Sequence, residues 1–123
     1  MPSPHKTRPR ILIVEDEVLV RMFMRDLFEE VGFKTREAAN AEEALELLKA
    51  EEFAVVISDI EMPGKTGLDL AWVVDSKWPR TALIIISGRT LPSPAAIPAR
   101  AKFIAKPWQI DVLLQTVREV PEQ

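Results

Sequence analysis

The sequence contains no cysteine and only one histidine, and these absences exclude several kinds of chemistry. Without cysteine there are no disulfides, thiolate metal sites, thiol nucleophiles or thiol redox sensors. The single histidine, His5, lies in a proline-rich leader that we expect to be disordered, so neither a serine–histidine triad nor a multi-histidine metal site can be built around it. Any chemistry must therefore use carboxylate, hydroxyl or amine groups.

Long apolar runs are also missing. No uninterrupted apolar run exceeds five residues, which is far shorter than a membrane span. The first ten residues, MPSPHKTRPR, lack the apolar core of a signal peptide, so we expect a cytoplasmic protein without membrane insertion. At 123 residues, with 47% hydrophobic and 28% charged side chains, the chain suits one domain, which we place at residues 10–120 between a leader at 1–9 and a tail at 121–123.

Charge is distributed unevenly along the chain. Residues 11–61 carry fourteen acidic and five basic side chains, whereas residues 62–123 carry five acidic and eight basic ones. A strongly acidic first half argues against direct binding of nucleic acid through a basic face, and it suits a hard cation such as Mg²⁺.

The pattern of apolar residues predicts strands that alternate with helices. Strands are predicted at residues 11–14, 33–38, 54–58, 82–87 and 102–105, and helices at 18–31, 41–49, 68–77 and 109–119. The first, third and fourth strands are continuously apolar, as strands covered on both faces must be. We therefore predict an α/β fold with a five-stranded, doubly wound parallel sheet and right-handed crossovers.

The helix ends and faces can also be predicted. Asn40 followed by Glu43 is typical of a capping box at the start of the second helix. In the first helix we expect Leu19, Met22, Phe23 and Leu27 to face the sheet, and Gly32 should end the helix.

Polar residues follow the predicted strands, and parallel strands present their carboxyl ends at one edge of a sheet. These residues are Glu15, Asp16 and Glu17 after the first strand, Asp59 after the third, Ser87 and Gly88 at the fourth, and Lys106 and Pro107 after the fifth. Carboxylates at such an edge can supply part of a magnesium shell, and Asp59 can act as an oxygen nucleophile toward a phosphoryl group. Lys106 and Ser87 would then bind the other phosphoryl oxygens.

Four motifs carry a family resemblance: ILIVEDE, VVISDIEMPGKTGLDL, IIIS followed by glycine, and FIAKP. In combination they make the chain similar to the receiver domain of the bacterial two-component response regulators, over roughly residues 10–120. The resemblance implies a flavodoxin-like strand order of 2-1-3-4-5. It also implies a phosphorelay module that signals by protein contacts, accepts its phosphoryl group from a histidine kinase or histidine phosphotransferase, and catalyses only its own phosphorylation and dephosphorylation.

The same resemblance assigns roles to individual residues. Asp59 is the expected phosphoacceptor, and the expected Mg²⁺ ligands are Asp16, Asp59 and the backbone carbonyl of Glu61, with Glu15 completing the acidic pair indirectly. Ser87 corresponds to the switch hydroxyl, Lys106 to the phosphate-binding lysine and Phe103 to the rotating aromatic residue. Pro107 resembles a position preceded by a cis peptide bond. Glu61 and Arg89 stand where the family influences dephosphorylation, and we expect their opposite charges to pair and lengthen the phosphorylated lifetime.

The chain departs from the family pattern where a fourth helix is expected. Pro92, Pro94 and Pro98 leave room for about one turn, because proline lacks an amide hydrogen and pushes the residue before it out of helical geometry. We expect a proline-rich loop in place of most of this helix, with a turn at residues 94–97 capped by Ser93. Leu91 and Ile97 should anchor the loop on the sheet edge.

The residues favour a stand-alone receiver with an unknown downstream partner over three other functions. A Mg²⁺-dependent aspartate-nucleophile phosphatase should have a second aspartate where this chain has Glu61. A flavin-binding protein should have a glycine-rich phosphate loop where this chain has Glu15, Asp16 and Glu17. A non-phosphorylated docking module would not need the complete set of Asp16, Asp59, Ser87 and Lys106.

Overall fold

The computed structural model describes residues 10–61, 67–88 and 96–120. Five parallel strands form one sheet in the order β2-β1-β3-β4-β5, as predicted. The strands are β1 (Arg10–Val14), β2 (Lys34–Ala38), β3 (Val55–Asp59), β4 (Ala82–Ser87) and β5 (Lys102–Ala105). The helices in the described residues are α1 (Val18–Glu30), α2 (Ala41–Ala50), α3 (Gly67–Lys77) and α4 (Ile110–Arg118).

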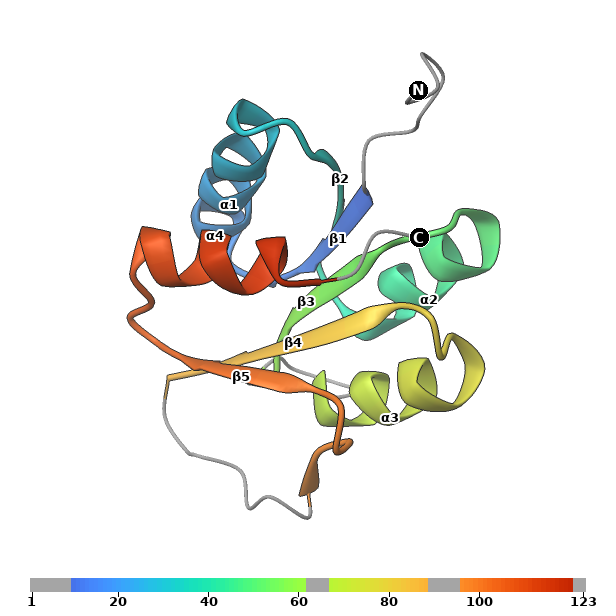
Figure 1. The fold of residues 1–123 in the computed structure, drawn as a ribbon. Helices are drawn as coiled ribbons and strands as arrows, with labels where there is room; N and C mark the ends of the chain where they lie inside the picture. The colour runs from blue at the N-terminus through green and yellow to red at the C-terminus, as the bar shows by residue number, and fades with distance from the viewer. Residues whose placement is uncertain (1–9, 62–66, 89–95, 121–123) are drawn as a thin grey trace, which may run out of the picture.

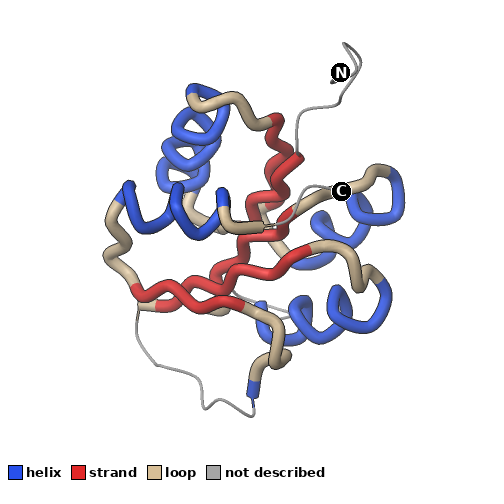
Figure 2. The backbone as a smooth tube through the Cα atoms, viewed as in Figure 1, coloured by secondary structure: helices blue, strands red, loops and turns tan. Residues whose placement is uncertain are grey.

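The sheet is covered on both faces (Figure 1). Helices α1 and α4 lie on one face and α2 and α3 on the other, with the strands running between the two layers of helices (Figure 2). Side chains alternate along each strand, so Ile11 and Ile13 of β1 join the first core whereas Leu12 and Val14 join the second. This burial on both faces explains the continuously apolar sequences of the central strands.

Local signals at the helix ends act as predicted. The Asn40 side chain accepts a hydrogen bond from the Glu43 amide at 2.8 Å, and the Glu43 carboxylate accepts one from the Ala39 amide at 2.8 Å. Gly32 follows α1 with a φ of 104°, a left-handed conformation that glycine adopts without strain.

The predicted inner face of α1 is correct for Leu27, which packs against the first core, and wrong for Leu19, Met22 and Phe23. Met24 and Phe28 are the buried residues of this helix, whereas Leu19 is 80% exposed and Met22 and Phe23 are exposed as well. The true stripe is displaced by about one residue, which rotates the helix by about 100° from the predicted orientation. Phe23 instead stacks on Trp108, with the ring centroids 5.9 Å apart.

Only part of the proline-rich segment lies within the described residues. Residues 96–101 form turns and no α-helix, as the prolines predict, whereas Leu91, Pro92, Ser93 and Pro94 lie outside the described residues. Trp72 of α3 donates its indole N–H to the Ala96 carbonyl at 2.9 Å. Arg100 donates to the Asp75 carboxylate at 2.7 Å and to backbone carbonyls at the end of α3. These contacts attach the segment before β5 to α3.

Within the described parts of the chain, the structure contains no helix that is both long and apolar enough to cross a membrane.

Candidate functional site

The predicted site residues meet at the carboxyl edge of the sheet because of the strand register. Asp59 ends β3 and pairs with Ile86, one residue before the end of β4. Glu15 follows β1 directly, and its amide donates to the Ala38 carbonyl at the end of β2. Asp59 and Glu15 are 4% and 2% exposed, so two carboxylates are buried at this edge.

Three carboxyl groups form the centre of the site. One oxygen from each of Glu15, Asp16 and Asp59 lies within 4.8 Å of the other two, and Asp16 is the more exposed member. Adjacent carboxylates repel unless a positive charge or a proton relieves them. Hard oxygen donors at one partly open position are what Mg²⁺ requires of a protein, since this ion keeps several of its waters. The donor set therefore fits the predicted cation.

Lys106 supplies a positive charge to the same cluster. Its ammonium group donates a hydrogen bond to Asp59 Oδ2 and lies 3.3 Å from Glu15 Oε1. Burial by itself lowers the pKa of Lys106, but the hydrogen bond that Lys106 donates to Asp59 and the charges of Glu15 and Asp59 outweigh burial and raise that pKa overall. Lys106 is therefore an ammonium ion at neutral pH. The peptide bond between Lys106 and Pro107 is cis, as predicted.

Glu15 has a strongly shifted pKa. Burial, together with the nearby charge of Asp59 and a hydrogen bond with Asp16, raises the pKa of Glu15 from 4.5 to about 7. The Glu17 amide and the Lys106 ammonium act in the opposite direction without cancelling the shift. One lysine therefore does not balance the acidic cluster, which leaves it able to attract a further cation.

Ser87 lies on β4, which pairs with β3, and Phe103 lies on β5, which pairs with β4. Ser87 ends β4, is 3% exposed and accepts a backbone hydrogen bond from the Lys106 amide at 2.9 Å. Phe103 is half-buried on β5, where it pairs with Ile85. The fold thus places Ser87 at the same edge as Asp59 and Lys106, and the switch roles of Ser87 and Phe103 stay predictions.

Glu61 connects the ends of β3 and β4. Its amide donates to Asp59 Oδ1 at 2.7 Å, and its side-chain Oε1 accepts a hydrogen bond from the Gly88 amide at 3.0 Å. The carboxylate of Glu61 therefore reaches across the edge of the site to the residue after Ser87. The predicted partner Arg89 lies outside the described residues, so the pairing of Glu61 with Arg89 stays a prediction.

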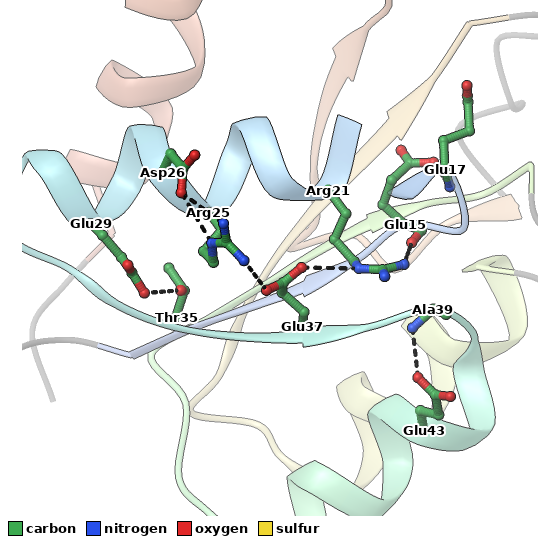
Figure 3. Close-up of polar contacts among 10 residues, drawn as sticks. All are labelled: Glu15, Glu17, Arg21, Arg25, Asp26, Glu29, Thr35, Glu37, Ala39 and Glu43. Atoms are coloured by element: carbon green, nitrogen blue, oxygen red, sulfur yellow. Dashed lines mark hydrogen bonds and ion pairs between the residues drawn. The ribbon is translucent and has the colours of Figure 1, made fainter. Parts of the chain in front are cut away.

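An arginine network beside the site was missed by the sequence analysis (Figure 3). Arg21 of α1 donates to the Glu15 carbonyl at 2.8 Å and to the Glu37 carboxylate of β2 at 3.1 Å. Arg25, one turn further along α1, donates to the second oxygen of Glu37 at 3.1 Å. No local signal in the sequence links either arginine to Glu37.

Two glycines allow backbone to approach the site closely. A Cβ at Gly67 would collide with the Asp59 carbonyl oxygen and the Ile60 Cα, so the first turn of α3 packs directly on the backbone of Asp59 and Ile60. A Cβ at Gly88 would lie 3.2 Å from the Lys106 Cβ.

A family model describes the chain over nearly its whole length. Residues 11–118 match the response regulator receiver domain. The chain is 34% identical over 119 residues to the C4-dicarboxylate transport transcriptional regulatory protein DctD of Rhizobium meliloti, covering 94% of this chain and 26% of that protein. It is 33% identical over 111 residues to the transcriptional regulatory protein PdtaR of Mycobacterium tuberculosis, covering 88% of this chain and 54% of that protein. The chain thus spans about a quarter to a half of these two relatives.

Shorter relatives and solved structures agree with this match. The chemotaxis protein CheY of Thermotoga maritima is 33% identical over 115 residues, covering 90% of this chain and 96% of that protein. A CheY-like receiver domain protein from Methanospirillum hungatei superimposes with a TM-score of 0.84 at 27% identity, covering 92% of this chain and 93% of that one. The response regulator TrrA from Thermotoga maritima, solved in complex with Mg²⁺ and BeF, gives a TM-score of 0.80 at 30% identity over 92% of this chain and 99% of that one. With the sheet order, the acidic edge and the family match in agreement, the chain belongs to the response regulator receiver domain family.

Proposed function

We propose that the chain accepts a phosphoryl group on Asp59 from the phosphohistidine of a histidine kinase or a histidine phosphotransferase. The observation that carries this proposal is the environment of Asp59, a buried carboxylate at a strand end that is hydrogen-bonded by Lys106 and grouped with Glu15 and Asp16. Aspartate phosphorylation and Mg²⁺ binding are typical of the family to which the chain belongs.

In the proposed transfer an Asp59 oxygen attacks the phosphorus atom of the donor. A new oxygen–phosphorus bond forms, the phosphorus–nitrogen bond breaks, and the electron pair stays on the imidazole of the partner, which takes up a proton. The Lys106 ammonium group binds the phosphoryl oxygens and stabilises their charge, and the Ser87 hydroxyl donates a hydrogen bond to them. Mg²⁺, held by Asp16, Asp59 and the Glu61 carbonyl with Glu15 beside them, would neutralise charge on the transferred group.

The donor must approach through the surface beside the site. Receiver domains interact with histidine kinases and with downstream effectors. Exposed apolar side chains of α1, including Leu19 and Phe23, lie on the helix that starts directly after the acidic loop, and the Phe23 ring meets Trp108 beyond Lys106. We propose this surface for protein contacts in the cytoplasm, with signalling by protein binding rather than by direct contact with nucleic acid.

Glu61 is proposed to lengthen the phosphorylated lifetime. Its carboxylate is anchored by the Gly88 amide across the edge of the site, where an attacking water would have to approach. The predicted pairing with Arg89 would restrain the same side chain further. An anchored carboxylate obstructs the water and also repels the hydroxide that forms from it.

Incubation with Mg²⁺ and acetyl phosphate, followed by intact mass measurement, tests the proposal. The parent should gain the mass of one phosphoryl group, and chelation of Mg²⁺ with EDTA should prevent the gain. The Asp59→Asn variant should gain none, while the Asp69→Asn variant, changed at an exposed position of α3, should behave like the parent. Equal labelling of Asp59→Asn and the parent would exclude Asp59 as the acceptor.

A further inference from the structure

The loop between β1 and α1 holds its shape through three hydrogen bonds that surround Asp16. The Glu15 amide donates to the Ala38 carbonyl at 3.0 Å, the Glu17 amide donates to the Glu15 carboxylate at 3.1 Å, and Arg21 donates to the Glu15 carbonyl at 2.8 Å. The first continues the β1–β2 ladder and the second lies within the loop itself. The third comes from a side chain one turn along the helix.

Arg21 is itself held in place from a neighbouring strand (Figure 3). Its Nε donates to Glu37 Oε1 at 3.1 Å, while Glu37 Oε2 accepts a hydrogen bond from Arg25 at 3.1 Å. The Arg21 side chain is 15% exposed, and that of Glu37 is 25% exposed. Glu37 therefore fixes the orientation of the Arg21 guanidinium group, and the guanidinium group in turn holds the Glu15 carbonyl in place.

We propose that Arg21 is a positioning residue for Mg²⁺ binding, because it holds the Glu15 carbonyl and thereby keeps the Asp16 carboxylate turned toward Glu15 and Asp59. This inference rests on the proposed function, since it assumes that the acidic cluster binds Mg²⁺. Asp16 is the most exposed of the three acidic residues and follows directly on the peptide that Arg21 anchors. Without that anchor the Asp16 peptide can rotate away from the site, and the ion must restore the order when it binds.

Electrostatics alone predicts the opposite change in Mg²⁺ affinity when Arg21 is replaced. Arg21 is a positive charge beside a cation site, so its removal should by charge alone tighten the binding of Mg²⁺. The proposal expects weaker binding despite the loss of that repulsion. Arg25 provides a matched comparison, because it is on the same helix and pairs with the same Glu37 carboxylate but has no hydrogen bond to the Glu15 carbonyl.

The test is a Mg²⁺ titration of the full chain in its unphosphorylated form. Binding is monitored through the amide chemical shifts of the residues in the loop between β1 and α1. Arg21→Met, which keeps most of the alkyl chain, should bind Mg²⁺ about tenfold more weakly than the parent, the usual effect of removing a partner that orients a metal ligand. Arg25→Met should bind as the parent does or more tightly. Glu37→Gln, which leaves Arg21 in place with a weaker partner, should lie between Arg21→Met and the parent.

Urea unfolding in EDTA separates positioning from stability. Each methionine variant loses an ion pair with Glu37 and one further partner, the Glu15 carbonyl for Arg21 and the exposed Asp26 carboxylate for Arg25. Their unfolding free energies should therefore fall by similar amounts, while only Arg21→Met loses Mg²⁺ affinity. If Arg21→Met does not fold, Arg21→Lys decides, because lysine keeps the charge but cannot span both acceptors, and weaker binding is again expected.

The outcomes distinguish this inference from the proposed function. A parent protein that does not bind Mg²⁺ would contradict the metal site itself. A parent that binds Mg²⁺, with Arg21 variants that bind it equally well or more tightly, would overturn the positioning role and leave the proposed function intact. Equal weakening in Arg21→Met and Arg25→Met would also overturn it, because a general loss of helix stability would then explain the effect.

Discussion

Glu15→Gln should stabilise the Mg²⁺-free protein at alkaline pH. Glu15 is 2% exposed, and burial raises its pKa from 4.5 to about 7. The folded protein therefore binds this proton more tightly than the unfolded chain does. Between about pH 4.5 and 7 the free energy of unfolding should fall as the pH rises, and the full cost is present above about pH 7. Glutamine keeps the shape of the side chain and removes the charge.

The expected gain in unfolding free energy follows from the size of the shift in the pKa of Glu15. The shift is 7 minus 4.5, or about 2.5 pKa units, and each unit corresponds to about 1.4 kcal/mol. The ionised Glu15 side chain thus costs the folded protein roughly 3 to 4 kcal/mol at pH 8. This cost is what a bound cation would offset, so the same residue that destabilises the free protein favours the Mg²⁺-bound one.

Urea unfolding in EDTA, monitored by tryptophan fluorescence at pH 5 and pH 8, measures the difference in unfolding free energy between Glu15→Gln and the parent. Glu15→Gln should exceed the parent in unfolding free energy at pH 8, and the two should converge at pH 5. Glu46→Gln is the control, because Glu46 is exposed and its ion pair with Lys49 spans 3.5 Å. A Glu15→Gln variant that is no more stable than the parent at pH 8, or one whose advantage is equal at both pH values, would refute the reasoning.

Three further predictions concern the site and the segment before β5. Asp16→Asn should bind Mg²⁺ more weakly than the parent in a titration, and equal affinity would show that Asp16 is not a ligand. Glu61→Ala should shorten the phosphorylated lifetime, measured by loss of the phosphorylated mass, whereas Glu43→Ala, which also removes an acceptor of a backbone amide, should leave it unchanged. Arg100→Met should lower the unfolding free energy by about 1 to 2 kcal/mol, since the Thr81 carbonyl of a buried residue loses its donor, and an unchanged urea midpoint would contradict this.

Much of the fold can be predicted from the sequence, because its signals are local. Continuous apolar runs predicted β1, β3 and β4, the Asn40 and Glu43 pair predicted the start of α2, and Gly32 predicted the end of α1. The meeting of Glu15, Asp16, Asp59 and Lys106 follows from parallel strands with aligned ends, so the sequence alone predicts that these side chains lie close together.

The contacts that were missed depend on how elements pack. The inner face of α1 was assigned one residue away from the true stripe, because apolar residues cover more than half of its circumference and Phe23 packs on Trp108 instead of the sheet. The pairing of Arg21 with Glu37 depends on where α1 lies along β2, which no local pattern specifies. The close approach of Gly67 to Asp59 likewise depends on how α3 meets the end of β3.

The most direct test of the central claim is to locate the phosphoryl group chemically. After phosphorylation with Mg²⁺ and acetyl phosphate, borohydride reduces an aspartyl phosphate to homoserine, and peptide mass spectrometry identifies the residue that has changed. The account predicts homoserine at position 59, dependent on Mg²⁺. Homoserine at another aspartate with none at position 59, or no homoserine in a parent protein that binds Mg²⁺, would contradict it.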